Sequence, residues 1–394
     1  MSDRLDPRLL SAIGEYGALG VDKCFNCGNC TAICPLSENG ETFPRRLIRY
    51  AQLGLKQPLL ASKELWLCYG CGECSETCPS QADPAQFMAA ARGYAAASYD
   101  PLGLARLLFT RPLVGVSLLV LLGVLIGLVV YTAHGVMPTD TLRLFDFIPA
   151  AAIHDLGLGA MALVGLAGLV GVVNMVRQVR REHPEPTTPR GLSDWIRALL
   201  DTFGAEVIAQ RRYRSDCGTA AERRSWLTAK WLVHGMVLWG FLGLLAATAL
   251  DYGLALVGIK AIGAWVPLWY PVRLLGTVAG LSMVSGTSIA ALNRLRRVDA
   301  TTARSSVADW TLLVLLWLAG TSGLALELAV YLPRPAPWAY WLLLAHIALS
   351  LELLLLLPFT KFAHALYRTA ALFIHALGRG AVVQHGDVGA STST

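Results

Sequence analysis

Residues 24–35 read CFNCGNCTAICP and residues 68–79 read CYGCGECSETCP. Both stretches follow one spacing, C-x-x-C-x-x-C-x-x-x-C-P, and together they hold eight of the nine cysteines in this chain of 394 residues. The long apolar runs, in contrast, all lie after residue 110. The sequence therefore divides near residue 105 into a cysteine module and an apolar module.

The repeated spacing is typical of the ligands in bacterial ferredoxins with two 4Fe–4S clusters. Three close cysteines on a tight loop reach three iron corners of a cubane, and the fourth cysteine of each run ligates the other cluster. The first predicted ligand set is Cys24, Cys27, Cys30 and Cys78, and the second is Cys34, Cys68, Cys71 and Cys74. Gly28, Gly70 and Gly72 are expected to let the backbone bend closely around the sulfur atoms.

Zinc and disulfides are the alternatives to iron–sulfur clusters. Structural zinc usually takes two separated pairs of ligands, not two four-cysteine runs that each end in proline. The start of the chain, MSDRLDPRLL, is charged and no apolar stretch with a cleavage site follows it, so we expect a cytosolic module with reduced thiols. Cys217 has no partner at a matching spacing and is expected to be a free thiol.

Helical patterns surround the cysteine runs. Apolar residues recur at helical spacing between the runs, at Leu47, Ile48, Ala51 and Leu55. After the second run, Asp83 and Pro84 are typical of the N-cap and first turn of a helix. We therefore expect an α-helical two-cluster ferredoxin module over residues 1–105.

The composition excludes a wholly soluble or disordered chain, because 55% of residues are hydrophobic and 15% are charged, against about 25% charged in soluble domains. Six continuous apolar runs are each long enough to cross about 30 Å of hydrocarbon as a helix. They cover residues 112–132, 149–175, 229–250, 268–292, 309–332 and 338–360. We expect a mainly α protein, with a six-span membrane domain over residues 106–380 and a disordered tail at 381–394.

The charges predict the orientation of the spans. Residues 176–228 carry ten arginines and the loop after the fourth span carries four more, whereas the opposite loops have only Arg143, Lys260 and Arg334. This positive-inside pattern places the long linker with the cysteine module in the cytosol, together with the C-terminus. It also accounts for the net charge of +6 without nucleic acid. Six apolar residues of the linker share one helical face that is expected to lie along the membrane surface: Leu192, Trp195, Ile196, Leu199, Leu200 and Phe203.

Four of the eight histidines lie inside or at the ends of the spans. His346 and His364 are 18 residues apart on the predicted sixth span, so they would face the same way, roughly 27 Å apart. With His154 near the outer surface and His234 near the inner one, we expect two b haems: an outer one on His154 and His346, and an inner one on His234 and His364. His375 is the alternative inner ligand. A histidine that only bonds a neighbouring helix is the competing explanation.

Other polar residues of the membrane domain are weaker candidates. Arg273 and His134, both toward the outer side, are predicted to contact a quinone near the outer haem. Proton conduction and helix-packing hydrogen bonds are equally open for the three acidic residues, Asp155, Glu327 and Glu352. No C-x-x-C-H occurs, which excludes covalent c-type haem.

The chain resembles the C subunit of the quinone-interacting membrane-bound oxidoreductase complex, Qmo. That family joins a ferredoxin module like the C subunit of heterodisulfide reductase to a cytochrome b domain. The resemblance rests on residues 24–35, 43–55, 66–68 and 78–79 and on the six spans. The separation of His346 and His364 also resembles the haem-ligand helix of the nitrate reductase gamma subunit family.

This resemblance implies two cytosolic flavin and iron–sulfur subunits resembling the A subunit of heterodisulfide reductase as partners, with adenylylsulfate reductase beyond them. The cysteine-rich CCG repeat of the disulfide-cleaving subunits is missing here. We therefore expect a subunit of a quinone-dependent oxidoreductase complex in the plasma membrane of a bacterium or archaeon, which relays electrons between a (mena)quinone pool and cytosolic subunits. A conduit to a periplasmic cytochrome and a structural anchor for the ferredoxin module are the alternatives.

Overall fold

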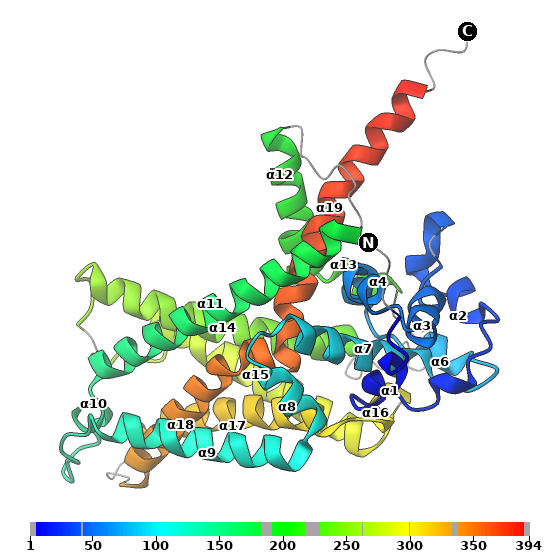
Figure 1. Ribbon diagram of the computed structural model, residues 1–394. Coiled ribbons are helices and arrows are strands. Elements are labelled where there is room, and N and C mark those ends of the chain that lie inside the picture. The colour runs from blue at the N-terminus through cyan, green and yellow to red at the C-terminus, as the bar shows by residue number, and fades with distance from the viewer. Residues whose placement is uncertain are drawn as a thin grey trace.

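The computed structural model describes residues 5–40, 42–182, 191–216, 229–261, 263–298, 300–332 and 337–389. Within these ranges all regular structure is helical, which confirms the predicted fold class (Figure 1). Cys217 and Arg334 lie outside the described residues.

Short helices build the module that carries the two cysteine runs. They are α1 (Leu9–Gly14), η1 (Val21–Lys23), α2 (Asn29–Ala32), η2 (Pro35–Gly40), α3 (Arg45–Gln52), α4 (Lys56–Ala61), α5 (Glu64–Leu67), α6 (Glu73–Glu76), α7 (Pro84–Tyr99) and α8 (Leu104–Thr110). The helix predicted between the runs is α3, which buries Leu47, Ile48 and Ala51. The predicted cap of α7 is also confirmed, because the Asp83 side chain accepts a hydrogen bond from the Gln86 N–H.

Six helices are long and apolar enough to cross a membrane, as predicted. They are α9 (Pro112–Tyr131), α11 (Ala150–Glu182), α14 (Lys230–Leu256), α15 (Pro271–Leu295), α17 (Val307–Ala329) and α18 (Trp338–Leu355). The remaining elements are α10 (Leu144–Phe147), α12 (Leu192–Leu199), the π-helical η3 (Leu200–Ile208), α13 (Arg211–Asp216), α16 (Ala300–Ala303), η6 (Leu357–Phe359), η7 (Lys361–Ala363) and α19 (His364–Gly389). In the bundle α14 packs on α15, α15 on α17, α17 on α18, and α18 on α9 and α11.

The sixth span is shorter than the sequence predicted. Helix α18 ends at Leu355 and two short 3-10 turns follow, so His346 and His364 are not on one helix. Pro358 lies in the first of these turns and lacks the N–H that a continuing helix needs, while Thr360 is fully extended. The expectation of two histidines on one face of a single helix is therefore wrong, and His364 instead begins α19.

The cysteine module is packed firmly onto one end of the bundle (Figure 1). Met175 and Val179 of α11 and Tyr367 of α19 are buried in the same core as Trp66 and Tyr99 of the module. A fully buried large apolar side chain contributes about 1.5–3 kcal/mol, whereas an exposed ion pair contributes about 0–1 kcal/mol. Apolar contact, not surface charge, therefore holds the module in place.

The connections after the second, fourth and sixth spans all lie on the side of the module, as the charge pattern predicted. Glu206 accepts a hydrogen bond from Tyr69, Thr301 lies against Gly72, and Arg304 pairs with Asp83. The six apolar side chains predicted to lie on the membrane surface are all exposed, on α12 and η3. Helix α19 continues to Gly389, where the sequence predicted a disordered tail, and residues 390–394 lie outside the described part of the chain.

Candidate redox-cofactor sites

The first predicted cysteine set surrounds one cavity. Cys24, Cys27, Cys30 and Cys78 line one pocket between the two loops. Burial opposes the thiolate of Cys78, but hydrogen bonds from the Ser80 hydroxyl and from backbone N–H groups outweigh that effect and lower its pKa. The fourth cysteine of the second run thus joins three cysteines of the first run, as the ferredoxin spacing requires.

The second predicted set also converges. Burial raises the pKa of Cys34 to about 11, and the thiols of Cys68 and Cys71 are near enough to add to the rise. Burial raises the pKa of Cys74 too, with Cys68, Cys71 and Cys34 among its neighbours. Thiols with a raised pKa keep their protons at neutral pH and bind iron only after losing them. Cluster binding would therefore release protons.

The backbone conformation at the glycines of the loops agrees with this arrangement. Gly28, Gly70 and Gly72 have φ angles of 91°, 71° and 99°, which side chains with a Cβ rarely adopt. The predicted tight bends are therefore present. Gly28 and Gly72 each precede the short helix that positions the next cysteine, Cys30 in α2 and Cys74 in α6.

Zinc and a cluster require different arrangements of the thiolates. Among the described residues, no three His, Cys, Asp or Glu side chains lie close enough to hold a single metal ion. The four thiolates of a zinc site meet at one ion through bonds of about 2.3 Å, whereas those of a cubane bind four separate irons and stand farther apart. Cysteines from two loops that line one shared pocket are compatible with a cluster.

The predicted inner histidines lie near each other at the module end of the bundle. The ring centres of His234, in α14, and His364, at the start of α19, are 6.4 Å apart. Two imidazoles that bind one iron from opposite sides through bonds of about 2 Å have ring centres about 6 Å apart. Both side chains are exposed, so their rings border open space instead of filling a packed core.

Each inner imidazole is oriented through its other nitrogen. His364 Nδ1 lies 2.6 Å from the Lys361 carbonyl oxygen, and His234 Nδ1 lies 3.3 Å from Gln210 Oε1. Hydrogen bonds of this kind fix the tautomer and leave Nε2 available for a metal. The inner pair therefore fits bis-histidine ligation of a haem in spacing, in tautomer and in its adjoining space.

Cationic side chains connect the second cysteine set with the inner histidines. Arg368, one helical turn after His364, donates to the carbonyl oxygens of Trp66, Leu67 and Cys68 at 2.9–3.3 Å. Lys230, the first residue of α14, donates to the carbonyl oxygen of Cys71 at 3.0 Å. Lys230 and Arg368 thus bond the second cysteine loop from the same two helices that carry His234 and His364.

A row of aromatic rings follows the same route. Arg368 lies over the ring of Tyr69 at 4.2 Å, Tyr69 stacks on Tyr213 at 5.9 Å, and Tyr213 meets His234 at 5.7 Å. The sequence alone does not mark Arg368, Lys230, Tyr213 or Gln210 as site residues. The only local signal was the position of Arg368 four residues after His364, because every other contact joins segments far apart in the chain.

The predicted outer histidines are less closely matched. His154 stacks on Tyr252 of α14 at 4.4 Å, and its buried Nδ1 has no hydrogen-bond partner among the described residues. His346 Nδ1 lies 2.9 Å from the Ser322 hydroxyl in α17. The part of the chain that the structure describes contains no direct contact between these two imidazoles. The orphaned nitrogen of His154 and the anchored nitrogen of His346 are compatible with an outer haem, but only the inner pair is spaced for one.

The glycine that faces His346 allows a test of the outer site. A Cβ on Gly323 would lie 3.0 Å from His346 Cε1, so Gly323→Val is expected to push the imidazole away and remove the outer haem while the inner haem remains. The measurement is protohaem per chain, which should fall by about half. Gly165→Val is the matched control, because a Cβ there meets nothing within 4 Å. Unchanged haem content in Gly323→Val would contradict His346 as a ligand.

The two residues predicted to contact a quinone, His134 and Arg273, contact different side chains. His134 is exposed and stacks on Tyr131 at 4.2 Å. Arg273 pairs with Glu327 at 3.3 Å, and its guanidinium lies 5.0 Å from the ring of Tyr331. Glu327 also accepts from the Thr277 hydroxyl at 2.7 Å, so this carboxylate is part of a helix-packing network. Glu352 differs, because its buried Oε1 has no hydrogen-bond partner among the described residues.

Converging cysteine sets on a helical module, fixed to six apolar helices, define a membrane-associated iron–sulfur electron-transfer protein. The family of Citrate utilization protein B matches residues 101–384, and the 4Fe-4S dicluster domain matches residues 20–82. The chain therefore belongs to the Citrate utilization protein B family, with an N-terminal dicluster domain whose eight cysteines are consistent with two 4Fe–4S clusters.

Curated relatives match either part of the chain. A protein of Archaeoglobus profundus that is named as similar to the C subunit of heterodisulfide reductase is 38% identical over 96 residues, 24% of this chain and 51% of the relative. The C subunit of the H(2):CoB-CoM heterodisulfide,ferredoxin reductase of Methanothermobacter thermautotrophicus is 33% identical over 63 residues, 16% of this chain and 34% of the relative. Citrate utilization protein B of Escherichia coli is 28% identical over 160 residues, 40% of each chain.

The chain spans about half the length of the first of these relatives and less of the others. No solved structure matches the chain. The module is thus related to the C subunit of heterodisulfide reductase, and the six apolar helices indicate a multi-pass membrane protein.

Proposed function

We propose that this chain is the membrane subunit of a quinone oxidoreductase complex, which relays electrons between a membrane (mena)quinone pool and cytosolic flavin and iron–sulfur subunits. Bound at the two cysteine sets and the two histidine pairs, clusters and b haems would supply centres that exchange one electron at a time. One observation in particular supports this proposal. Arg368 donates a hydrogen bond to the carbonyl oxygen of Cys68, and it lies one helical turn after His364, so one residue joins the second cysteine set to the inner histidines. Electron flow in either direction is compatible with it.

In this proposal each cysteine set holds one cluster and each histidine pair holds one haem. One cluster is held by Cys24, Cys27, Cys30 and Cys78, and the other by Cys34, Cys68, Cys71 and Cys74. The inner haem is held by His234 and His364, and the outer haem by His154 and His346. The module and the C-terminus face the cytosol of a bacterium or archaeon, in accord with the positive-inside pattern.

We expect a soluble partner to dock beside the first cysteine set. Cys27 is exposed, and the neighbouring Phe25 exposes 65% of its surface. An exposed aromatic ring beside a redox centre is typical of a surface that another protein covers. Proteins resembling the A subunit of heterodisulfide reductase are the proposed partners, because relatives of this module are subunits of heterodisulfide reductases.

The metabolic setting has two candidates. The resemblance to the Qmo C subunit favours dissimilatory sulfur metabolism, with adenylylsulfate reductase as a further partner. Membership of the Citrate utilization protein B family, over residues 101–384, favours a role in citrate utilization instead. In both settings the membrane chain would have the same task, which is electron exchange with quinone.

The test is a visible spectrum of the purified full chain after addition of a quinol. The proposed function predicts b-type haem bands that appear on reduction by quinol. Haem that no quinol reduces would favour a conduit to a periplasmic cytochrome, and absence of haem would favour a structural anchor. Both outcomes would contradict the proposal.

A further inference from the structure

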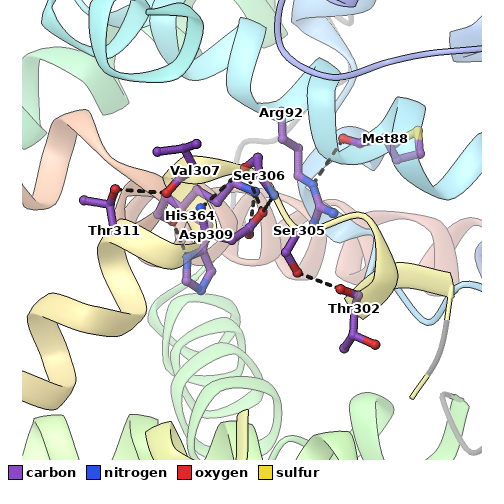
Figure 2. Close-up of polar contacts among 10 residues, drawn as sticks. Met88, Arg92, Thr302, Ser305, Ser306, Val307, Asp309, Thr311 and His364 are labelled. Carbon is purple, nitrogen blue, oxygen red and sulfur yellow. Dashed lines mark hydrogen bonds and ion pairs between the residues drawn. The ribbon is translucent and has the colours of Figure 1, made fainter. Parts of the chain in front are cut away.

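Two arginines from different helices share one acceptor in the second cysteine loop. Arg92 of α7 donates to the carbonyl oxygen of Cys68 at 3.1 Å, and Arg368 of α19 donates to the same oxygen at 2.9 Å. Arg92 is also held within its own helix, because its Nε donates to the carbonyl oxygen of Met88 one turn earlier (Figure 2). Two positive charges therefore lie close together at the first cysteine of this run.

These two guanidinium groups lack a carboxylate partner among the residues that the structure describes. Glu206 bonds the hydroxyl of Tyr69, the ring over which Arg368 lies. Its Oε1, however, pairs with Arg211 and Arg212. Like charges at one carbonyl oxygen repel each other, most strongly where water is partly excluded. A cluster held by four thiolates carries net negative charge, so at the second cysteine set it would be the counterion of this pair.

The first cysteine loop allows a comparison within the chain. Cys24 has the same place in its run as Cys68, and its carbonyl oxygen accepts from the neutral Gln52 amide at 2.9 Å. Arg45 lines the first pocket. Within the described part of the chain, however, no cationic side chain donates to the backbone of residues 24–30. Positive charge is therefore concentrated at the second loop.

We propose that Arg92, Arg368 and Lys230, which donates to the Cys71 carbonyl oxygen, make the cluster at the second cysteine set the more easily reduced of the two. The proposal rests on the cluster ligands assigned under the proposed function. Reduction adds one electron, and nearby positive charge stabilises the added charge and so raises the reduction potential. One electron shared by the two clusters would lie mainly on the cluster beside the inner histidines, with no bond broken and no proton moved.

Two features of the first set act in the opposite direction. Cys27 is exposed, and water also stabilises added negative charge. The sulfur of Cys78 accepts from the Ala82 N–H at 3.4 Å and lies 3.5 Å from the Ser80 hydroxyl. These donors are neutral, whereas the three donors at the second loop carry full charges and are half-buried. Charged donors form hydrogen bonds that are roughly twice as strong, so we expect the cations to have the larger effect.

The order of the two potentials is measured in the full chain in phospholipid nanodiscs. A titration with chemical redox mediators, followed by electron paramagnetic resonance, gives a midpoint potential for each reduced cluster. The resonance that survives in Cys24→Ser identifies the second cluster, and the one that survives in Cys34→Ser identifies the first. We expect the second cluster of the native chain to have the higher potential. An equal or lower potential would overturn the proposal.

Arg92→Met and Arg368→Met test the two guanidinium groups. Each variant removes a charge but keeps a long side chain, and each is expected to lower the potential of the second cluster by about 59 mV or more. That shift is a tenfold change in the equilibrium constant of a one-electron couple. Arg92→Lys keeps the charge and should retain most of the native potential. Arg8→Met, at an exposed arginine beside α1, is the matched control and should change neither potential.

A purely structural role for the arginines would give a different result. Arg92→Met and Arg368→Met would then lose cluster iron, but the clusters that remain would keep the native potential, and this outcome would overturn the proposal. An equal fall in Arg8→Met would also overturn it, because the potential would then follow the net charge alone. If a variant retains no second cluster, the order of potentials in the native chain decides.

The failure of this inference and the failure of the proposed function are distinguishable, because the titration does not use quinol. If quinol reduces nothing in the native chain while the potentials have the expected order, the quinone function fails and this inference stands. If quinol reduces the haem but the order is reversed, the function stands and this inference fails. A native chain without a second cluster would contradict both.

Discussion

Replacing His364 by alanine is expected to remove one of two haems and to leave both iron–sulfur clusters in place. The ring centres of His364 and His234 are 6.4 Å apart, and the Lys361 carbonyl oxygen orients the His364 ring through Nδ1. Without this imidazole the inner haem loses one axial ligand, so protohaem per chain should fall from about two to about one. Reduction of the clusters by quinol should be lost at the same time, because His364 lies between the outer part of the bundle and the Cys68 loop.

His375→Ala is the matched control for this prediction. His375 lies on the same helix, three turns further on, and was the alternative ligand from the sequence. We expect full haem content in this variant. Loss of haem in His375→Ala together with full haem in His364→Ala would contradict the assignment, and the electron paramagnetic resonance of the clusters serves as the test of folding in both variants.

Replacing single cysteines is expected to show that the two runs exchange their fourth ligands. Cys78→Ser should damage the same cluster as Cys24→Ser, because both side chains line the first cavity. Cys34→Ser should damage the other cluster, since Cys34 lies among Cys68, Cys71 and Cys74. Each variant should retain about four of eight cluster irons, and the surviving resonance should be the same in Cys78→Ser and Cys24→Ser.

This arrangement would be contradicted if variants of the same cysteine run lost the same cluster. If Cys34→Ser and Cys24→Ser left the same surviving resonance, each run would hold its own cluster and the crossed ligand sets would be wrong. A full complement of cluster iron in Cys78→Ser would exclude that thiolate as a ligand. Ser80→Ala is a suitable control, since it removes a hydrogen bond to Cys78 but no sulfur atom.

Local patterns were sufficient to predict the module and the spans. The cysteine spacing and the glycines between the cysteines determine two tight loops within a few residues each, and these loops carry the sets that converge in the structure. The helix at Arg45–Gln52 and the capped helix after Asp83 also follow from spacing and capping alone. Apolar runs of bilayer length predicted six helices because a chain in hydrocarbon must satisfy its own backbone.

Contacts between distant segments were beyond the reach of sequence patterns. Apolar residues continue from α18 through Pro358 to Thr360, so hydropathy extended the sixth span past its true end at Leu355. The same limit applies to α11, which continues past residue 175 to Glu182 because Val179 is buried against the cysteine module. Hydropathy measures transfer into lipid and does not distinguish lipid from a neighbouring domain.

For the inner histidines, the sequence predicted the pair but not the structural reason for it. The pairing of His234 with His364 was predicted from depth in the membrane, and the two ring centres do lie 6.4 Å apart. The reason given, two ligands on one continuous helix, was wrong because the chain breaks before His364. Arg368 and Lys230, which join the inner pair to the second cysteine set, come from two helices whose approach no local pattern encodes.

In our proposal, the two cysteine sets and the two histidine pairs hold four redox centres in one chain. The most direct measurement is the content of iron, acid-labile sulfide and protohaem per chain in the purified full-length protein. We expect about eight cluster irons with as many sulfides, and two protohaems. Zinc in place of iron, or clusters without any protohaem, would contradict it.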